Sequence, residues 1–152
     1  MPGDRPRPHG ERPEQARDLA HSSGHTDRTA TSGDGVDDES TRATIAAVTR
    51  LDAAFDRGDI DAFMAAMTDD CVWESFTPAP DGHRHEGQAA VRQAMADFLG
   101  SSPVFDGEEM LVCGDRATVR WSCRFAGGHV RGVDVVRVRD GKVAEILSYV
   151  KG

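Results

Sequence analysis

One carboxyl group lies on an otherwise apolar face of a predicted strand. Asp134 falls in residues 130–138, which alternate like a β-strand, and it shares a strand face with Val136. A carboxyl on such a face loses hydration, which raises its pKa. It could then serve as a general acid, or as a neutral hydrogen-bond donor to a developing oxyanion. The alternative is a structural aspartate that pairs with an arginine of a neighbouring strand.

Two polar residues in a second apolar segment could assist Asp134. Residues 71–76 have strand composition, and alternation places Ser75 on the same face as Trp73. Glu74 then points to the opposite face, unless a one-residue change of register brings it inward as a base. Ser75 has no useful basicity, so its predicted role is to orient a substrate.

His83 and His85 flank Arg84 in a predicted loop. His85 could transfer protons at the mouth of a pocket, because histidine titrates near neutral pH. The His-x-His pair could also bind a metal together with His129, but the spacing fixes no third ligand. We therefore predict no metal site, and exposed loop histidines are the alternative to a role for His85.

The predicted inner faces of the strands are apolar apart from isolated polar groups, which is typical of a ligand pocket and also of an ordinary sheet core. The two tryptophans could stack a planar, conjugated ligand. The residues predicted to contact a substrate are Trp73, Trp121, Cys123, Phe125, Val136, Ile146 and Ser148. The three cysteines have no neighbouring base at fixed spacing, so they are predicted to be small buried hydrophobes.

Helix and strand patterns predict the elements that position these residues. A first helix is predicted to begin near Ser40 and end at Gly58, and a second to run from its cap Asp59 to Met67. A third helix is predicted at 87–99. Strands are predicted at 71–76, 104–113, 116–126, 130–140 and 143–150. Turns with glycine make the later strands an antiparallel meander, so the fold class is α+β.

The first forty residues differ in composition from the rest. Residues 1–40 contain no aromatic residue, no isoleucine and no cysteine, but four prolines and five glycines. Such a segment cannot bury enough apolar surface to offset its ordering entropy, so we expect a disordered N-terminal arm. Residues 41–152 suffice for one domain with a single core.

Composition also excludes several classes of protein. The 152 residues carry a net charge of -8, so no nucleic-acid partner is expected. No apolar run is long enough to span a bilayer, and no secretory signal is visible, so no membrane association is expected. Three cysteines without a CxxC pair argue against a disulfide framework, and we expect a soluble protein of the cytoplasm.

Four segments, together with the order of the elements, carry a resemblance to a known family. They are FDRGDIDAF at 55–63, TDDCVWE at 68–74, HEGQAAVR at 85–92 and GVDVVRVRDGKV at 132–143. Over residues 40–152 the chain resembles the nuclear transport factor 2-like superfamily, and within it the SnoaL-like polyketide cyclase and ketosteroid isomerase branch. The resemblance implies a cone-shaped, curved, mostly antiparallel sheet around three helices, with an apolar pocket at the open end.

The resemblance also assigns roles to particular positions. In the ketosteroid isomerase branch a carboxyl at the position of Asp134 donates a hydrogen bond to the oxyanion (that enzyme is also a standard example of a raised carboxyl pKa). The isomerase base corresponds to Ser75 here, and its helix-one tyrosine to Leu51. Steroid isomerisation by the same two-part machinery is therefore not expected.

The sequence thus predicts an enzyme of SnoaL-like type without a cofactor. Its substrate would be a small apolar cyclic or polyketide-like molecule, and its chemistry cyclisation, isomerisation, dehydration or epoxide opening by acid–base catalysis. One alternative is a non-catalytic binding protein with the same pocket. Another is a dimeric protein-interaction module, because Tyr149, Leu147 and Val135 would form an apolar outer face of the sheet. We expect a homodimer through that face.

Overall fold

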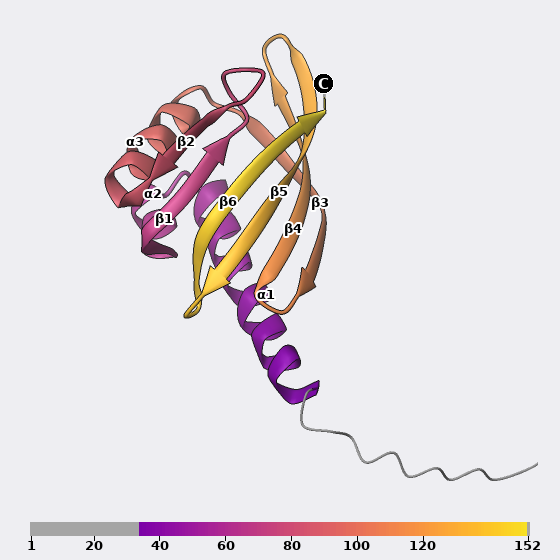
Figure 1. The fold of residues 1–152 in the computed structure, drawn as a ribbon. Helices are drawn as coiled ribbons and strands as arrows, with labels where there is room; N and C mark the ends of the chain where they lie inside the picture. The colour runs from indigo at the N-terminus through magenta and orange to yellow at the C-terminus, as the bar shows by residue number, and fades with distance from the viewer. Residues whose placement is uncertain (1–33, 152) are drawn as a thin grey trace, which may run out of the picture.

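The computed structural model of the chain describes residues 34–151 (Figure 1). Its elements are α1 (Asp34–Asp56), α2 (Ile60–Ala65), β1 (Met67–Ser75), β2 (His83–Glu86), α3 (Gly87–Gly100), β3 (Val104–Cys113), β4 (Arg116–Phe125), β5 (Gly128–Arg139) and β6 (Lys142–Lys151). The predicted arm falls mostly outside the described residues. Its last part belongs to α1, which begins at Asp34, earlier than the predicted start near Ser40.

The junction between the first two helices follows local rules. Gly58 adopts a φ of 63°, a left-handed conformation that glycine accepts without a steric penalty, and it ends α1. Asp59 caps α2, because its side chain accepts a hydrogen bond from the Ala62 backbone N–H at 2.9 Å. Met67, which was predicted in this helix, is instead the first residue of β1. It pairs there with Val143 of β6, so sheet pairing overrides the helical pattern.

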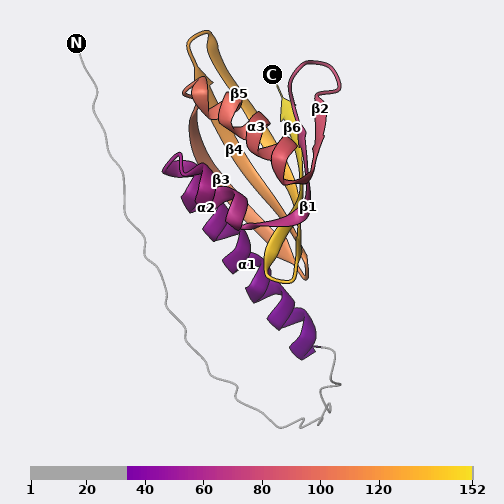
Figure 2. The same ribbon diagram turned by 90° about the vertical axis from the view of Figure 1, so that its left-hand side faces the viewer.

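The six strands form one curved, unclosed sheet in the order β2-β1-β6-β5-β4-β3. All neighbours are antiparallel except β1 and β6, which run parallel. The three helices lie on one face of this sheet (Figure 2). The predicted α+β fold, with a mostly antiparallel sheet curved around N-terminal helices, is confirmed.

The segment with the two histidines is a strand and not the predicted loop. In β2, His85 pairs with Trp73 and His83 with Ser75, so both histidines extend the edge of the sheet. The tight return at Gly82 makes this pairing possible. A Cβ at Gly82 would lie only 1.7 Å from the Ser75 carbonyl oxygen, and its φ is +71°, so only glycine fits there.

Alternate residues of the strands face the helices and form the core. Buried residues on this face include Trp121 and Cys123 of β4, Val136 of β5 and Ile146 of β6. Val136 and Ile146 belong to one core with Val48 and Leu51 of α1 and Val91 of α3, among others. Within residues 34–151, no helix combines the length and apolar character needed to cross a membrane.

Candidate active site

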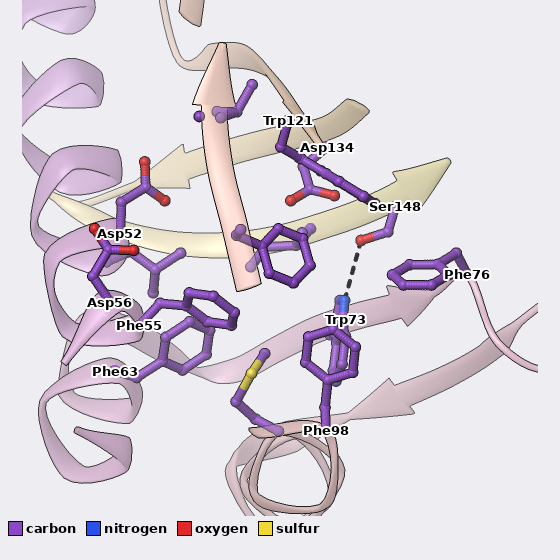
Figure 3. Close-up of a pocket in the computed structure, with 16 residues that line it drawn as sticks. Asp52, Phe55, Asp56, Phe63, Trp73, Phe76, Phe98, Trp121, Asp134 and Ser148 are labelled. Carbon is purple, nitrogen blue, oxygen red and sulfur yellow. Dashed lines mark hydrogen bonds between the residues drawn. The ribbon is translucent and has the colours of Figure 1, made fainter. Parts of the chain in front are cut away.

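A cavity of about 190 Å³ lies between the helices and the concave face of the sheet (Figure 3). Seven of the sixteen residues that line it are aromatic, out of nine Phe, Trp and Tyr residues in the chain. These seven are Phe55, Phe63, Trp73, Phe76, Phe98, Phe105 and Trp121. The apolar side chains that could have filled one continuous core therefore surround an open space.

Edge-to-face contacts hold the aromatic wall in place. The ring centroids of Phe105 and Trp121 lie 5.0 Å apart, and those of Phe55 and Phe105 lie 5.3 Å apart. Trp73 meets Phe98 of α3 at 5.9 Å. Such pairs stabilise beyond their buried area. The wall is thus a connected set of rings from α1, α3 and the sheet.

Asp134 of β5 points into this cavity (Figure 3). Its Oδ1 atom is buried and has no hydrogen-bond partner among residues 34–151. Burial raises the pKa of Asp134 to about 6, and the polar groups of Ser148 and Trp121 beside it offset part of that rise. Asp134 is not held in an ion pair by any arginine of the described residues, which removes the structural alternative suggested by the sequence.

Ser148 lies directly across the strand pair from Asp134, because the two residues are partners in the register of β5 and β6. The Trp73 indole Nε1–H donates a hydrogen bond to Ser148 Oγ at 3.3 Å. The serine hydroxyl is left free to donate toward the carboxyl. Ser148 therefore links Trp73 to Asp134.

Trp121 is positioned by the residue opposite it in β5. Trp121 pairs with Gly132, and a Cβ on Gly132 would lie 2.3 Å from Cζ2 of the indole. The ring occupies the space that a side chain at Gly132 would take. Its Nε1–H is buried and lacks a hydrogen-bond partner within the described part of the chain. The cavity thus contains an unpaired donor near the unpaired acceptor of Asp134.

Two carboxylates of α1 also line the cavity, and sequence reasoning missed both. Asp52 and Asp56 lie one helical turn apart, beside the apolar stripe that carries Leu51 and Phe55. Burial raises the pKa of Asp52 to about 6, with further contributions from the negative charges of Asp134 and Asp56, although its side chain reaches solvent. The sequence showed only two aspartates next to the apolar face of a predicted helix. The same pattern is typical of a solvent-exposed helix face.

Of the three predicted catalytic residues, which are Asp134, Ser75 and His85, only Asp134 lines the cavity. Ser75 is buried on the side of Trp73, but its hydroxyl donates to the backbone carbonyl oxygens of Thr77 at 2.8 Å and His83 at 3.2 Å. These two hydrogen bonds stabilise the turn that leads into β2. Glu74 lies on the opposite face, 3.7 Å from Arg84, so neither residue of this pair lines the cavity.

His85 lies beside Trp73, with 5.6 Å between the ring centroids, and does not line the cavity. Burial and the neighbouring His83 lower the pKa of His85. No group of three or more His, Cys, Asp or Glu side chains suited to hold a metal is found in the described residues.

Four of the seven predicted contact residues line the cavity: Trp73, Trp121, Ile146 and Ser148. Val136 and Cys123 are buried but do not line the cavity, and burial raises the pKa of the Cys123 thiol. Phe125 is 51% exposed. It lies at the end of β4, where the strand extends past the helices, so alternation alone placed it wrongly.

A protein-family model and the solved structures similar to this chain indicate the same family. Residues 48–146 match the model of the SnoaL-like domain. A nuclear transport factor 2-like protein of unknown function from Mesorhizobium loti has 39% sequence identity and a TM-score of 0.67, over 74% of this chain and 93% of that one. Comparison with curated proteins gave no match.

Two further solved structures carry functional descriptions. A proposed polyketide cyclase from Sinorhizobium meliloti is 28% identical with a TM-score of 0.60, over 68% of this chain and 93% of that one. A proposed ketosteroid isomerase from Kribbella flavida is 18% identical with a TM-score of 0.66, over 74% of this chain and 80% of that one, which shows the shared fold alone. The chain therefore belongs to the SnoaL-like family of nuclear transport factor 2-like proteins.

Proposed function

We propose that the protein is an enzyme that performs cofactor-free acid–base chemistry on a small apolar cyclic or polyketide-like molecule. The observation that carries this proposal is the Asp134 carboxyl, which lies in an aromatic cavity outside any ion pair of the described residues, with Oδ1 unpartnered and its pKa raised to about 6. A group that titrates near neutral pH can both give and take a proton at the rates catalysis needs. The family and the polyketide cyclase-like relative support the same reaction class.

Each residue of the site has a proposed role that follows from its chemistry. In its protonated form Asp134 donates to a carbonyl or epoxide oxygen of the substrate, and in its ionised form it takes a proton from carbon or water. Ser148 and the Trp121 indole N–H lie beside the carboxyl and favour its ionised form. The rings of Trp73 and Trp121 hold the substrate and exclude water, which strengthens the interactions of the carboxyl. Ser75 and His85 have no role in the proposed reaction, because neither lines the cavity.

Turnover of small ketones and epoxides, compared between the wild type and Asp134→Asn, tests the proposal. Asparagine keeps the shape but cannot exchange the proton. We expect at least a tenfold loss of turnover, since one acid–base group contributes roughly 10²–10⁴-fold. Asp69→Asn, at an exposed position of β1 away from the cavity, is the matched control. Full turnover in Asp134→Asn would show that the reaction does not depend on this carboxyl and would contradict the proposal.

We also propose that two copies pair through the outer face of the sheet and that the protein acts in the cytoplasm. The outer apolar patch consists of Val133 and Val135 of β5 with their cross-strand partners Tyr149 and Leu147 of β6. Tyr149 is 52% exposed. Glu108, Arg120 and Arg131 lie beside this patch and form ion pairs with one another. An apolar centre with charges of both signs at its edge suits a self-complementary contact.

A further inference from the structure

The charges that line the cavity are all of one sign. Asp52, Asp56 and Asp134 line it, whereas no lysine, arginine or histidine of the described residues does. None of the three forms an ion pair with another residue of 34–151. Elsewhere acids do pair with arginines, as Asp106 does with Arg124 at 2.8 Å. Charged groups in clefts attract ligands of opposite sign, so this cavity disfavours anions.

The three carboxyls lie on two sides of the cavity. Asp52 and Asp56 face it from α1, whereas Asp134 faces it from the sheet beside Ser148 (Figure 3). The side chains of Asp52 and Asp56 reach solvent, but Oδ1 of Asp134 is buried and unpaired. The helix pair therefore marks the mouth of the cavity, and Asp134 marks its interior.

Aromatic rings lie between these two sides. Phe55 is on the same helix as the mouth carboxylates, and its ring meets that of Phe105 edge to face. The faces of such rings attract cations and repel anions. A positive group at the mouth would be stabilised by the rings and by both carboxylates. It would also relieve the repulsion that raises the pKa of Asp52.

We propose that the cavity takes a one- or two-ring apolar molecule that bears a basic amine, with its ammonium group held between Asp52 and Asp56. An ammonium group has three N–H donors, enough to serve both carboxylates. This rests on the proposed function, because the rings then bring a reacting atom to Asp134. The amine acts only in recognition, so the chemistry at Asp134 does not depend on it.

The size of the cavity limits the ligand. An apolar cavity of about 150 Å³ takes one benzene ring. The cavity here, at about 190 Å³, is somewhat larger and opens at the mouth pair. A single substituted ring or two small fused rings fit, with a substituent that reaches the mouth. Indane derivatives substituted at carbon 2 meet this description, and they exist as amine, alcohol and carboxylate with the same ring system.

Binding of these three probes can be followed without a label. Trp73 and Trp121 are the only tryptophans of the chain, and both line the cavity, so intrinsic fluorescence reports on it directly. At neutral pH we expect 2-aminoindane to bind about fivefold to tenfold more tightly than 2-indanol, as one or two half-exposed charge pairs would provide. Indane-2-carboxylate should bind most weakly of the three.

Variants separate recognition of the amine from the chemistry at Asp134. In the double variant Asp52→Asn/Asp56→Asn the ratio of the dissociation constant of 2-indanol to that of 2-aminoindane should fall to about one. Asp69→Asn should keep the wild-type ratio. Equal binding of amine and alcohol by the wild type, or tightest binding of the carboxylate, would overturn the amine proposal. So would a preference that survives the double variant. The proposed function would then stand, since the turnover of Asp134→Asn decides it independently.

Discussion

Asp52 on α1 and Asp134 on β5 line the same cavity, and the charge of Asp134 helps to raise the pKa of Asp52 to about 6. Burial is the larger cause, and Asp56 adds a smaller contribution. The ionisation of Asp134 therefore influences the protonation of Asp52. The pKa of Asp52 on a helix thus depends on the charge of Asp134, which lies on a strand far away in the sequence.

Removal of the Asp134 charge should therefore lower the pKa of Asp52. In Asp134→Asn one of the contributions that raise it is lost, while burial remains, so the shift is downward but incomplete. Carboxyl carbon NMR titration of both proteins measures this change, with Asp52→Asn to assign the signal. An unchanged pKa of Asp52 would mean that the two groups do not interact.

The buried carboxyl should also make stability depend on pH. The pKa of Asp134 rises from an ordinary value of 3.8 when unfolded to about 6 when folded, so the folded state binds the proton more tightly. Stability from this group is therefore highest below about pH 4 and falls as pH rises to about 6. The loss is on the order of 2–3 kcal/mol and stays constant above that range.

Urea unfolding of the wild type and Asp134→Asn over this pH range measures the contribution of Asp134, together with the smaller change that its charge makes to the pKa of Asp52. The variant has no carboxyl to ionise, so the difference in unfolding free energy, variant minus wild type, should increase from about pH 4 to about pH 6. The cost of the buried asparagine amide does not change with pH. Asp69→Asn should show no such slope, and parallel curves for wild type and Asp134→Asn would rule out a raised pKa.

Gly132 and Gly107 allow a comparison of two alanine substitutions in the wall. A Cβ at Gly132 would collide with the Trp121 ring, whereas one at Gly107 meets open space within the cavity lining. Gly132→Ala should cost about 1–3 kcal/mol of unfolding free energy and alter tryptophan fluorescence, because the indole must move. Gly107→Ala should cost less. Equal losses in thermal unfolding would show that Gly132 does not position Trp121.

The expected homodimer remains a prediction, and the outer apolar patch offers a direct test. Tyr149→Glu places a charge in the middle of that patch and should convert a dimer into a monomer, as measured by sedimentation. Glu39→Gln, at an exposed position of α1, is a control that should leave the assembly unchanged. A wild-type monomer would remove the pairing proposal without affecting the cavity.

The part of the site that the sequence could predict rests on strand alternation. Because side chains alternate between the two faces of a strand, Asp134, Trp121 and Ser148 could be assigned to one surface from spacing alone. The strand limits at 104–113 agree with β3, and the turns after the later strands are where the glycines predicted them. A period of two leaves little freedom once the buried face is known.

The remaining site residues depend on contacts that spacing does not encode. Asp52 and Asp56 lie at the edge of a helical stripe, where a carboxylate turns to solvent or to a cavity according to what packs opposite. Ser75 faces inward as alternation predicts, but the turn that follows it supplies two carbonyl oxygens that take its hydroxyl. His85 was misplaced because its loop closes into a strand that needs Gly82.

The pKa of Asp134, measured by carboxyl carbon NMR titration of the full chain, tests the central claim most directly. Asp134→Asn assigns the signal. A value of about 6, as the structure predicts, would mean a desolvated carboxyl that can exchange a proton near neutral pH. A value near or below 3.8 would mean a hydrated or paired aspartate and would contradict the proposed acid–base role.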